Sequence, residues 1–238
     1  MERADDIDSP AAAASALQWW LDAGVDCLVA EEPRDWLKPK AEPAAAPTAE
    51  APAGDLPGQL DLFQTWLGSA DSMPFASPSA PRVCPAGDPT SGLMIITDMP
   101  TGEDCESGIL LSGDTGRLFD RILAAIGRDR ESIYLAALSC LRPPGGQLAD
   151  EPARQCAILA RHHIGLAAPR AVLLFGDSCC KILLGLPVTR ARGRWHEIAT
   201  HSGAVPTLAT YAPAFLLTRP SAKAQVWADL QMLMEGLK

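Results

Sequence analysis

The feature that most restricts the fold is an alternation of short apolar runs with longer amphipathic segments, which begins at residue 93. Runs typical of buried strands are Leu93–Ile96, Ile133–Leu138, Ala171–Phe175 and Val205–Thr210. Helical spacing predicts helices at Gly116–Ile126, Glu151–Ala167, Asp177–Leu184 and Ser221–Leu237. Strands that alternate with helices pair in parallel and carry helices on both faces. The sequence therefore predicts an α/β fold, a three-layer α/β/α sandwich around a central, mainly parallel four-stranded sheet. The ligand crevice is expected at the carboxyl ends of the strands.

Three segments are expected before this domain, which spans residues 93–238. They are a helical arm (1–37), a Pro/Ala-rich flexible linker (38–58) and a short helix, Gln59–Leu67, with its connecting segment (59–92). In the arm, Leu17, Trp20 and Leu21 recur at helical spacing. Residues 15–37 either dock onto a protein partner or pack onto the chain's own sheet.

The charge distribution also changes near residue 93. Residues 1–92 carry 5 basic and 15 acidic side chains, whereas residues 93–238 carry 15 basic and 14 acidic ones. The net charge of −9 opposes binding to nucleic acid, but this objection does not apply to the C-terminal part. No apolar run reaches the roughly 20 residues of a membrane span, and the acidic start is unlike a secretory signal. We expect a cytoplasmic protein that does not enter a membrane.

Six segments that follow the predicted strands form an ordered series of motifs. They are TDMPTGED (97–104), SGILLSGDTGRLFDRILAAIG (107–127), YLAALSCLRPPGG (134–146), LLFGDS (173–178), TRARGRWHE (189–197) and TYAPAFLL (210–217). Together they resemble the uracil-DNA glycosylases of the bacterial iron–sulfur type (family 4-like). The patterns of that family are GEAPG, GxPFVGxAG, an Asn before KCRPP, LRGRWHE, and a late His-Pro-Ser/Ala followed by Leu-Leu.

The resemblance implies an enzyme that flips uracil out of DNA and breaks its glycosidic bond, which leaves a uracil anion. Ala212 stands at the position of the family His that donates a hydrogen bond to this anion. Ala137 stands at the position of the Asn that binds the uracil edge, and Leu111 replaces a stacking Phe. Because methyl groups cannot donate hydrogen bonds, we expect uracil excision to be impaired or absent.

One carboxylate remains at the expected site. Asp98 occupies the position of the family Glu and is the candidate catalytic residue. The pocket for the base is expected to be lined by Met99, Pro100, Leu111, Ala137 and Ala212. A pocket of this composition could also accept a small apolar molecule.

The resemblance further implies a 4Fe-4S cluster held by two upstream cysteines, the Cys of KCRPP and a later Cys. Of these only Cys156 is kept, because Leu141 replaces the Cys of KCRPP, with Cys140 beside it, and the upstream region 70–74 contains no cysteine. We therefore expect no metal and no cofactor, with Cys156 and Cys140 as remnants of a cluster site. An alternative is an improvised site made by Cys84, Cys105, Cys140 and Cys156. The other cysteines, Cys27, Cys179 and Cys180, are interpreted as packing residues.

Basic side chains are expected on the strand-end face. They are Arg142, Arg190, Arg192, Arg194 and Arg219. Such side chains predict sequence-nonspecific binding of single- or double-stranded DNA through phosphate contacts. The alternative is that RGRWHE anchors a turn, with its arginines paired to Glu197 and neighbouring acids. His162 and His163 are predicted on the surface at the end of a helix.

Three functions remain open at this point. The first is a glycosylase-fold protein with impaired or absent catalysis that acts in base-excision repair through DNA or a partner. The second is an active glycosylase for uracil or another damaged base. The third is a non-catalytic scaffold that docks through its N-terminal helix.

Overall fold

A computed structural model describes residue 14, residues 56–77, 79–146 and 148–237. Most of the predicted arm and residues 38–55 of the linker lie outside the described residues. The exception in the arm is Ala14, which is helical and exposed. No helix in the described ranges is long and apolar enough to cross a bilayer.

The described residues form a six-stranded sheet in the order β1-β3-β2-β4-β6-β5. Its strands are β1 (Ala86–Gly87), β2 (Leu93–Thr97), β3 (Tyr134–Ala137), β4 (Ala171–Phe175), β5 (Trp195–Thr200) and β6 (Gly203–Thr210). The pairs β3-β2, β2-β4 and β4-β6 are parallel. They are the four predicted strands, so the predicted parallel core is confirmed. The edge strands β1 and β5 are antiparallel and were not predicted.

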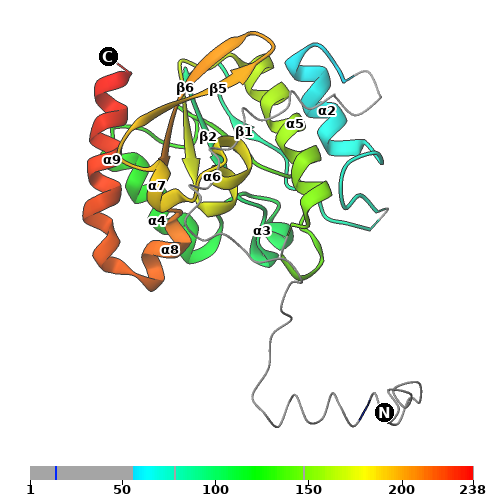
Figure 1. Ribbon diagram of the computed structural model, residues 1–238, viewed down its shortest axis with the longest axis horizontal. Coiled ribbons are helices and arrows are strands. Elements are labelled where there is room, and N and C mark those ends of the chain that lie inside the picture. Colours follow the sequence, from blue (N-terminus) through cyan, green and yellow to red (C-terminus); the bar gives the residue numbers. More distant parts are fainter. Residues whose placement is uncertain (1–13, 15–55, 78, 147, 238) are drawn as a thin grey trace, which may run out of the picture. The chain divides into compact units, whose positions relative to one another are not determined.

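Helices cover both faces of this sheet. They are α2 (Leu60–Ser69), α3 (Gly102–Ser107), α4 (Gly113–Ala125), α5 (Asp150–Ala167), α6 (Asp177–Leu184), α7 (Val188–Ala191), α8 (Pro213–Thr218) and α9 (Lys223–Gly236). Short 3-10 turns occupy Pro144–Gly146 and Pro220–Ala222. Figure 1 shows α9 to the left of the sheet and α5 to its right. The predicted three-layer α/β/α arrangement is therefore confirmed.

The two core clusters follow from the alternation of side chains along each strand. All five residues of β2 are buried, and successive side chains point to opposite faces. Leu93 and Ile95 belong to the cluster that contains side chains of α4 and α9. Met94 and Ile96 belong to the cluster that contains side chains of α5 and α6. This explains why the strand is a continuous apolar run without polar alternation.

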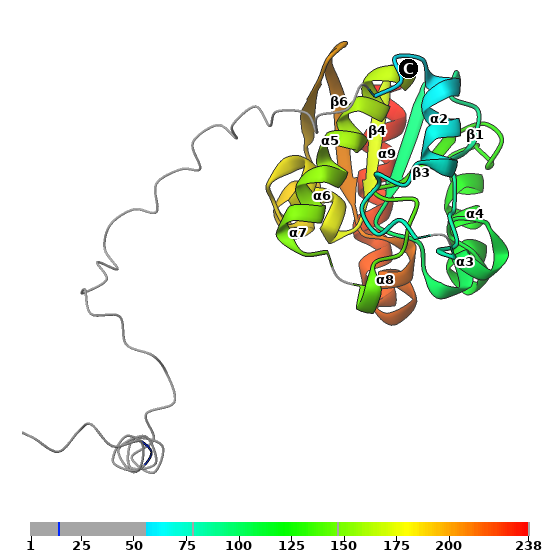
Figure 2. The ribbon, with the colours of Figure 1, turned by 90° about the vertical axis from the view of Figure 1, so that its right-hand side faces the viewer.

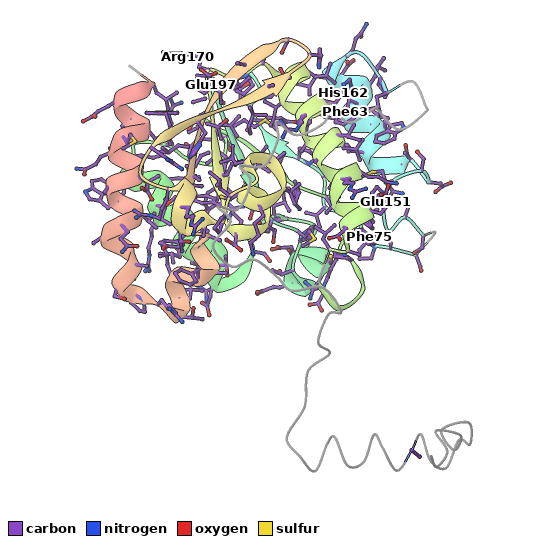
Figure 3. All side chains as sticks on the ribbon, in the orientation of Figure 1. Phe63, Phe75, Glu151, His162, Arg170 and Glu197 are labelled. Carbon is purple, nitrogen blue, oxygen red and sulfur yellow. The ribbon has the colours of Figure 1, made fainter. Side chains whose placement is uncertain are left out.

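The short helix α2 packs against α5 and belongs to the same compact body as the sheet. Its Phe63 is completely buried and meets the His162 ring edge-on at 5.0 Å (Figure 3). The segment 59–92, which the sequence set apart from the α/β domain, thus contributes part of the core. Its own cluster includes Phe63, Leu67 and Met73.

Candidate functional site

The candidate site lies where the strand order reverses. From β2 the chain passes to β3 on one side, and then to β4 and β6 on the other. In such sheets the loops after the two central strands separate and leave a crevice at their carboxyl ends. Figures 1 and 2 place α3 and α8 at this end of the sheet, where β2 and β6 finish. A cleft of about 260 Å³ opens there.

Loops after all four parallel strands line this cleft. The lining residues are Thr97, Asp98, Met99, Pro100, Thr101, Asp104, Leu111, Thr115, Arg142, Pro143, Gly146, Ser178, Ala212 and Ala214. The predicted site residues Asp98, Met99, Pro100, Leu111 and Ala212 are thus brought together, along with Arg142. Ala137 does not line this cleft. It borders a smaller cavity close to Phe63 and Cys156 instead.

Asp98 follows β2 and reaches the first turn of α6. Its Oδ1 accepts a hydrogen bond of 2.8 Å from the backbone N–H of Cys179, and a Cβ added to Gly176 would meet its Oδ2 at 2.4 Å. The carboxylate therefore caps the N-terminus of α6, a helix that follows a different strand, β4. Burial raises the pKa of Asp98, against the N–H groups of Cys179 and Ser178, which lower it. One oxygen of the candidate catalytic carboxylate is consequently engaged in a hydrogen bond that stabilises the fold.

A second carboxylate in the cleft, Asp104, was missed by the sequence analysis. Its Oδ2 accepts from the Thr101 N–H at 2.9 Å, and its Oδ1 accepts from the Ser112 N–H and hydroxyl, both at 2.7 Å. Burial alone raises the pKa of Asp104, but these hydrogen bonds outweigh it and hold the pKa below its usual range. Asp104 joins the first motif loop to the second. The Thr101-x-x-Asp104 pattern is a capping box and was the signal that could have identified it.

The second motif loop is held in an unusual backbone conformation. Leu111 has a φ of 52°, in the left-handed region that side chains rarely adopt. The Arg130 guanidinium donates to the carbonyl oxygens of Leu110 at 2.8 Å and Leu111 at 2.7 Å. The loop thus presents the Leu111 side chain to the cleft, where it supplies apolar contact without an aromatic ring.

The wall after β6 also lacks a polar side chain at its expected position. Ala212 is half-buried and is the N-cap residue of α8, where its side chain makes no capping hydrogen bond. Among the described lining residues there is no His, Asn or Gln. The remaining side-chain donors of the lining are hydroxyl groups of Ser and Thr and the Arg142 guanidinium. Arg142 donates to the Pro100 carbonyl at 3.1 Å and is otherwise exposed.

The structure separates the predicted DNA-binding arginines into two groups. Arg190, Arg194 and Arg219 are exposed, and the Arg219 guanidinium lies 5.6 Å from the centre of the Phe215 ring. Arg192 points inward instead. It pairs with the buried Asp229 at 3.0 Å and lies over the Tyr211 ring at 5.4 Å.

The prediction that Arg192 contacts DNA is therefore wrong, because its guanidinium is committed to a buried carboxylate. The alternative interpretation, an anchored turn, holds for this arginine, although its partner is Asp229 on α9 and not Glu197. Trp195 of the same motif packs onto α9, where a Cβ on Gly236 would meet its ring at 2.5 Å. The motif thus fastens the loop before β5 to the last helix.

The histidine prediction is also wrong for one of the two residues. His163 is 4% exposed, and its Nε2 lies 2.7 Å from the Tyr134 hydroxyl. Gln64 of α2 donates to the same hydroxyl at 2.7 Å, so the hydroxyl proton is free to point at His163. Burial, followed by the nearby His162, lowers the pKa of His163 to about 3. His162 is half-buried, with Nε2 2.9 Å from the Pro57 carbonyl.

The residues at the implied cluster positions do not fit an iron–sulfur cluster. Met73, Cys140 and Cys156 border one cavity of about 20 Å³, which has room for about one water molecule. Burial raises the pKa of Cys140 to about 12 and that of Cys156 to about 11. In the described part of the chain, no three His, Cys, Asp or Glu side chains gather as metal ligands.

The predicted packing roles of the vicinal cysteines agree with their positions. Cys179 and Cys180 are both completely buried in the core cluster beneath α6. Cys84 is exposed and Cys105 is partly exposed. Cys27 lies outside the described residues.

The fold and the cleft define a doubly wound α/β protein with a pocket for a small chemical group at its switch point. A model of the uracil DNA glycosylase superfamily matches residues 84–231. The chain therefore belongs to the uracil-DNA glycosylase superfamily, of which it is a divergent member.

Two type-4 uracil-DNA glycosylases are similar to this chain. The type-4 uracil-DNA glycosylase of Pyrobaculum aerophilum is 25% identical over 184 residues, which cover 74% of this chain and 94% of the relative. The type-4 uracil-DNA glycosylase of Archaeoglobus fulgidus is 22% identical over 156 residues, which cover 63% of this chain and 78% of the relative. The resemblance deduced from the motifs is thereby confirmed.

Proposed function

We propose that this chain acts in base-excision repair as a DNA-binding member of its superfamily whose uracil-excision chemistry is strongly impaired or lost. The observation that carries the proposal is the composition of the cleft. Its walls present Met99, Pro100, Leu111 and Ala212, where excision requires donors aimed at a departing base. The names of the two type-4 relatives support DNA as the partner. The cytoplasm remains the expected place of action.

Both carboxylates of the cleft already accept hydrogen bonds from the protein. Asp98 accepts from the first turn of α6, and Asp104 accepts from Thr101 and Ser112. The loss of one preorganised donor typically slows such a reaction by about 10²–10³-fold. We therefore propose that the cleft can accommodate an extruded base but cannot stabilise the charge that develops on it.

DNA contact is assigned to the exposed cations of the predicted set. Arg190, Arg194 and Arg219 are exposed, and Arg142 lies in the cleft itself. Phosphate neutralisation by such side chains gives affinity with little sequence preference and a strong dependence on salt. The proposed ligand is therefore single- or double-stranded DNA of any sequence.

The binding half of the proposal is tested by measuring DNA affinity between low and moderate salt for the full-length chain. In an Arg190→Ala/Arg219→Ala variant, the slope of log affinity against log salt should become shallower by about 0.7 per lost contact on single strands and about 0.9 on duplex. The matched control is Arg121→Ala/Arg154→Ala, which removes two exposed arginines from α4 and α5. Equal slopes for both variants would remove the assignment of the DNA surface.

The catalytic half is tested by restoring a donor. Ala212→His places an imidazole at the N-terminus of α8, and we expect it to raise uracil release above that of the wild type. Ala214→His is the control, because Ala214 also lines the cleft but lies two residues further along α8. Equal rates for both variants would mean that the missing donor at residue 212 is not what limits excision.

A second function is favoured by one observation. Asp98 is a desolvated carboxylate inside the cleft, and such a group can stabilise an oxocarbenium-like sugar or activate water. An active glycosylase for uracil or another damaged base is therefore the alternative proposal. This alternative requires that the wild-type chain releases a base and that the Asp98→Asn substitution abolishes this release. The third function, docking of a protein partner through residues 15–37, concerns residues that the structure does not describe and stays a prediction.

A further inference from the structure

Arg82 fastens the segment that precedes the sheet. Its Nη1 donates to the Leu67 carbonyl at 2.9 Å, and its Nη2 donates to the Ala70 carbonyl at 2.7 Å. Nη1 also lies 3.5 Å from the Met73 sulfur. Carbonyls at the end of a helix have no partner within the helix, and a cation there offsets the negative end of its dipole. One guanidinium therefore caps α2 and holds the turn that follows it.

The main chain around Arg82 is attached to the sheet side of the molecule. Arg82 and Leu141 form an isolated antiparallel bridge, and the Val83 N–H donates to the Cys140 carbonyl at 2.9 Å. Leu141 directly precedes Arg142, which lines the cleft. The two backbone segments that pair here therefore hold both α2, through Arg82, and one wall of the cleft, through Arg142.

An apolar cluster fills the space beneath this attachment. Its members are Phe63, Leu67, Met73, Cys140, Leu141 and Leu159, each no more than 7% exposed. A cavity of about 20 Å³ lies beside these side chains, and it is close to the size of one water molecule. Packing of this density leaves no room for a group of several heavy atoms.

The same positions are those to which the family resemblance assigns the iron–sulfur ligands. Leu141 stands at the Cys of KCRPP, Met73 lies in the region of the upstream pair, and Cys156 is the retained cysteine. The fold still brings them together, since Met73 and Cys156 border one cavity and Leu141 belongs to the cluster beside it. Side chains that pack against one another have taken the place of side chains that would bind a metal.

We propose that Arg82 and this apolar cluster replace an iron–sulfur cluster as the structural link between residues 56–83 and the α/β sheet. The chain folds and keeps its cleft loop in place without iron. This inference is independent of whether the cleft releases uracil or binds DNA, because it concerns only what holds α2 and the backbone at Arg82.

The first test is the iron and acid-labile sulfide content of full-length protein purified without oxygen. The expected result is far less than one iron per chain and no visible absorbance of a cluster. An iron and sulfide content that approaches one cluster per chain would overturn the proposal. Thermal unfolding with and without a strong iron chelator should give the same midpoint, and a midpoint lowered by the chelator would also overturn it.

The second test addresses Arg82 by amide hydrogen exchange in the full-length chain. Arg82→Ala removes the donor to two carbonyls and should speed exchange in α2 by about tenfold or more, while β4 is unchanged. The control is Arg128→Ala, which removes an arginine that donates to one carbonyl, that of Ser132, away from α2. Exchange in α2 that is equally slow in both variants would show that Arg82 is not the link.

Discussion

At the scale of single residues, Gly176 explains how Asp98 can reach the start of α6. Its φ is 103°, and an added Cβ would meet the Asp98 Oδ2 at 2.4 Å. Glycine is therefore required twice at this position, once for the backbone and once for the contact.

We predict that Gly176→Ala lowers the free energy of unfolding by about 1–3 kcal/mol. In an Asp98→Ala background the same change should cost less, because the clash is gone and only the backbone strain remains. Urea unfolding of the four proteins measures this coupling. Equal costs in both backgrounds would mean that the carboxylate does not press on this turn.

His163 makes stability depend on pH. Its pKa in the folded chain is about 3, whereas an unperturbed His has a pKa of about 6.5, so the unfolded chain binds more protons between these values. The contribution is fully present above pH 6.5 and is lost as the pH falls through this window.

We predict that His163→Leu reduces the loss of unfolding free energy between pH 7 and pH 5 by about 2 kcal/mol relative to wild type. Urea unfolding at the two pH values measures the difference. His201→Ala, which removes an exposed imidazole, is the control and should retain the wild-type loss. If His163→Leu and wild type lost the same amount, His163 would not be neutral in the folded chain.

At the scale of elements, the ion pair of Arg192 and Asp229 connects the loop before β5 to α9. Asp229 is 1% exposed and also accepts from the Thr210 hydroxyl at 2.7 Å. Burial raises the pKa of Asp229, while Thr210 and Arg192 act in the opposite direction. The carboxylate therefore depends on its partners to remain charged.

We predict that Arg192→Ala lowers the free energy of unfolding by about 3–5 kcal/mol, because it leaves a buried carboxylate unpaired. The neighbouring exposed Arg194 provides the comparison, and Arg194→Ala should stay within about 0.5 kcal/mol of wild type. Chemical denaturation of both variants measures the difference. If Arg192→Ala were as stable as Arg194→Ala, the pair with Asp229 would not stabilise the fold, and Arg192 would again be a candidate for DNA contact.

The elements that the sequence predicted are those with a strong periodic pattern. The strands β2, β3 and β4 are largely apolar, and α6 begins and ends at the predicted residues. The missed elements are short or contain polar residues. The strand β1 has only two residues, and β5 lies in a motif that suggested a basic loop. The pairing of β5 with β6 decides its conformation, and that partner is not evident from local composition.

The location of the candidate site was predictable, because the ends of the parallel strands determine it. The loops after β2, β3, β4 and β6 meet at one cleft, as the order of the motifs indicated. The orientation of individual side chains was not predictable. Arg192 turns toward Asp229, 37 residues further along the chain, and Ala137 borders the cavity near α2. Contacts between residues so far apart in the sequence depend on tertiary packing, and the spacing of residues within a motif does not predict them.

At the scale of the whole molecule, the superfamily framework is retained, and we propose that the groups that perform its chemistry are replaced. The doubly wound sheet, the cleft and the Asp98 carboxylate are in place, but Ala212 and Leu111 stand where the family resemblance implies a hydrogen-bond donor and a stacking ring. We propose the same for the second site of the type-4 pattern, where an apolar cluster includes Leu141. Among the described residues, no buried side-chain nitrogen or oxygen lacks a hydrogen-bond partner.

The rate of uracil release from single- and double-stranded DNA by the wild-type chain tests this account most directly. The measurement is made side by side with a type-4 uracil-DNA glycosylase under the same conditions. The account predicts release slower by at least about 10³-fold, since one missing donor already costs about 10²–10³. Release at a rate comparable with the type-4 enzyme would contradict it and would establish that a cleft lined by Leu111 and Ala212 can catalyse excision.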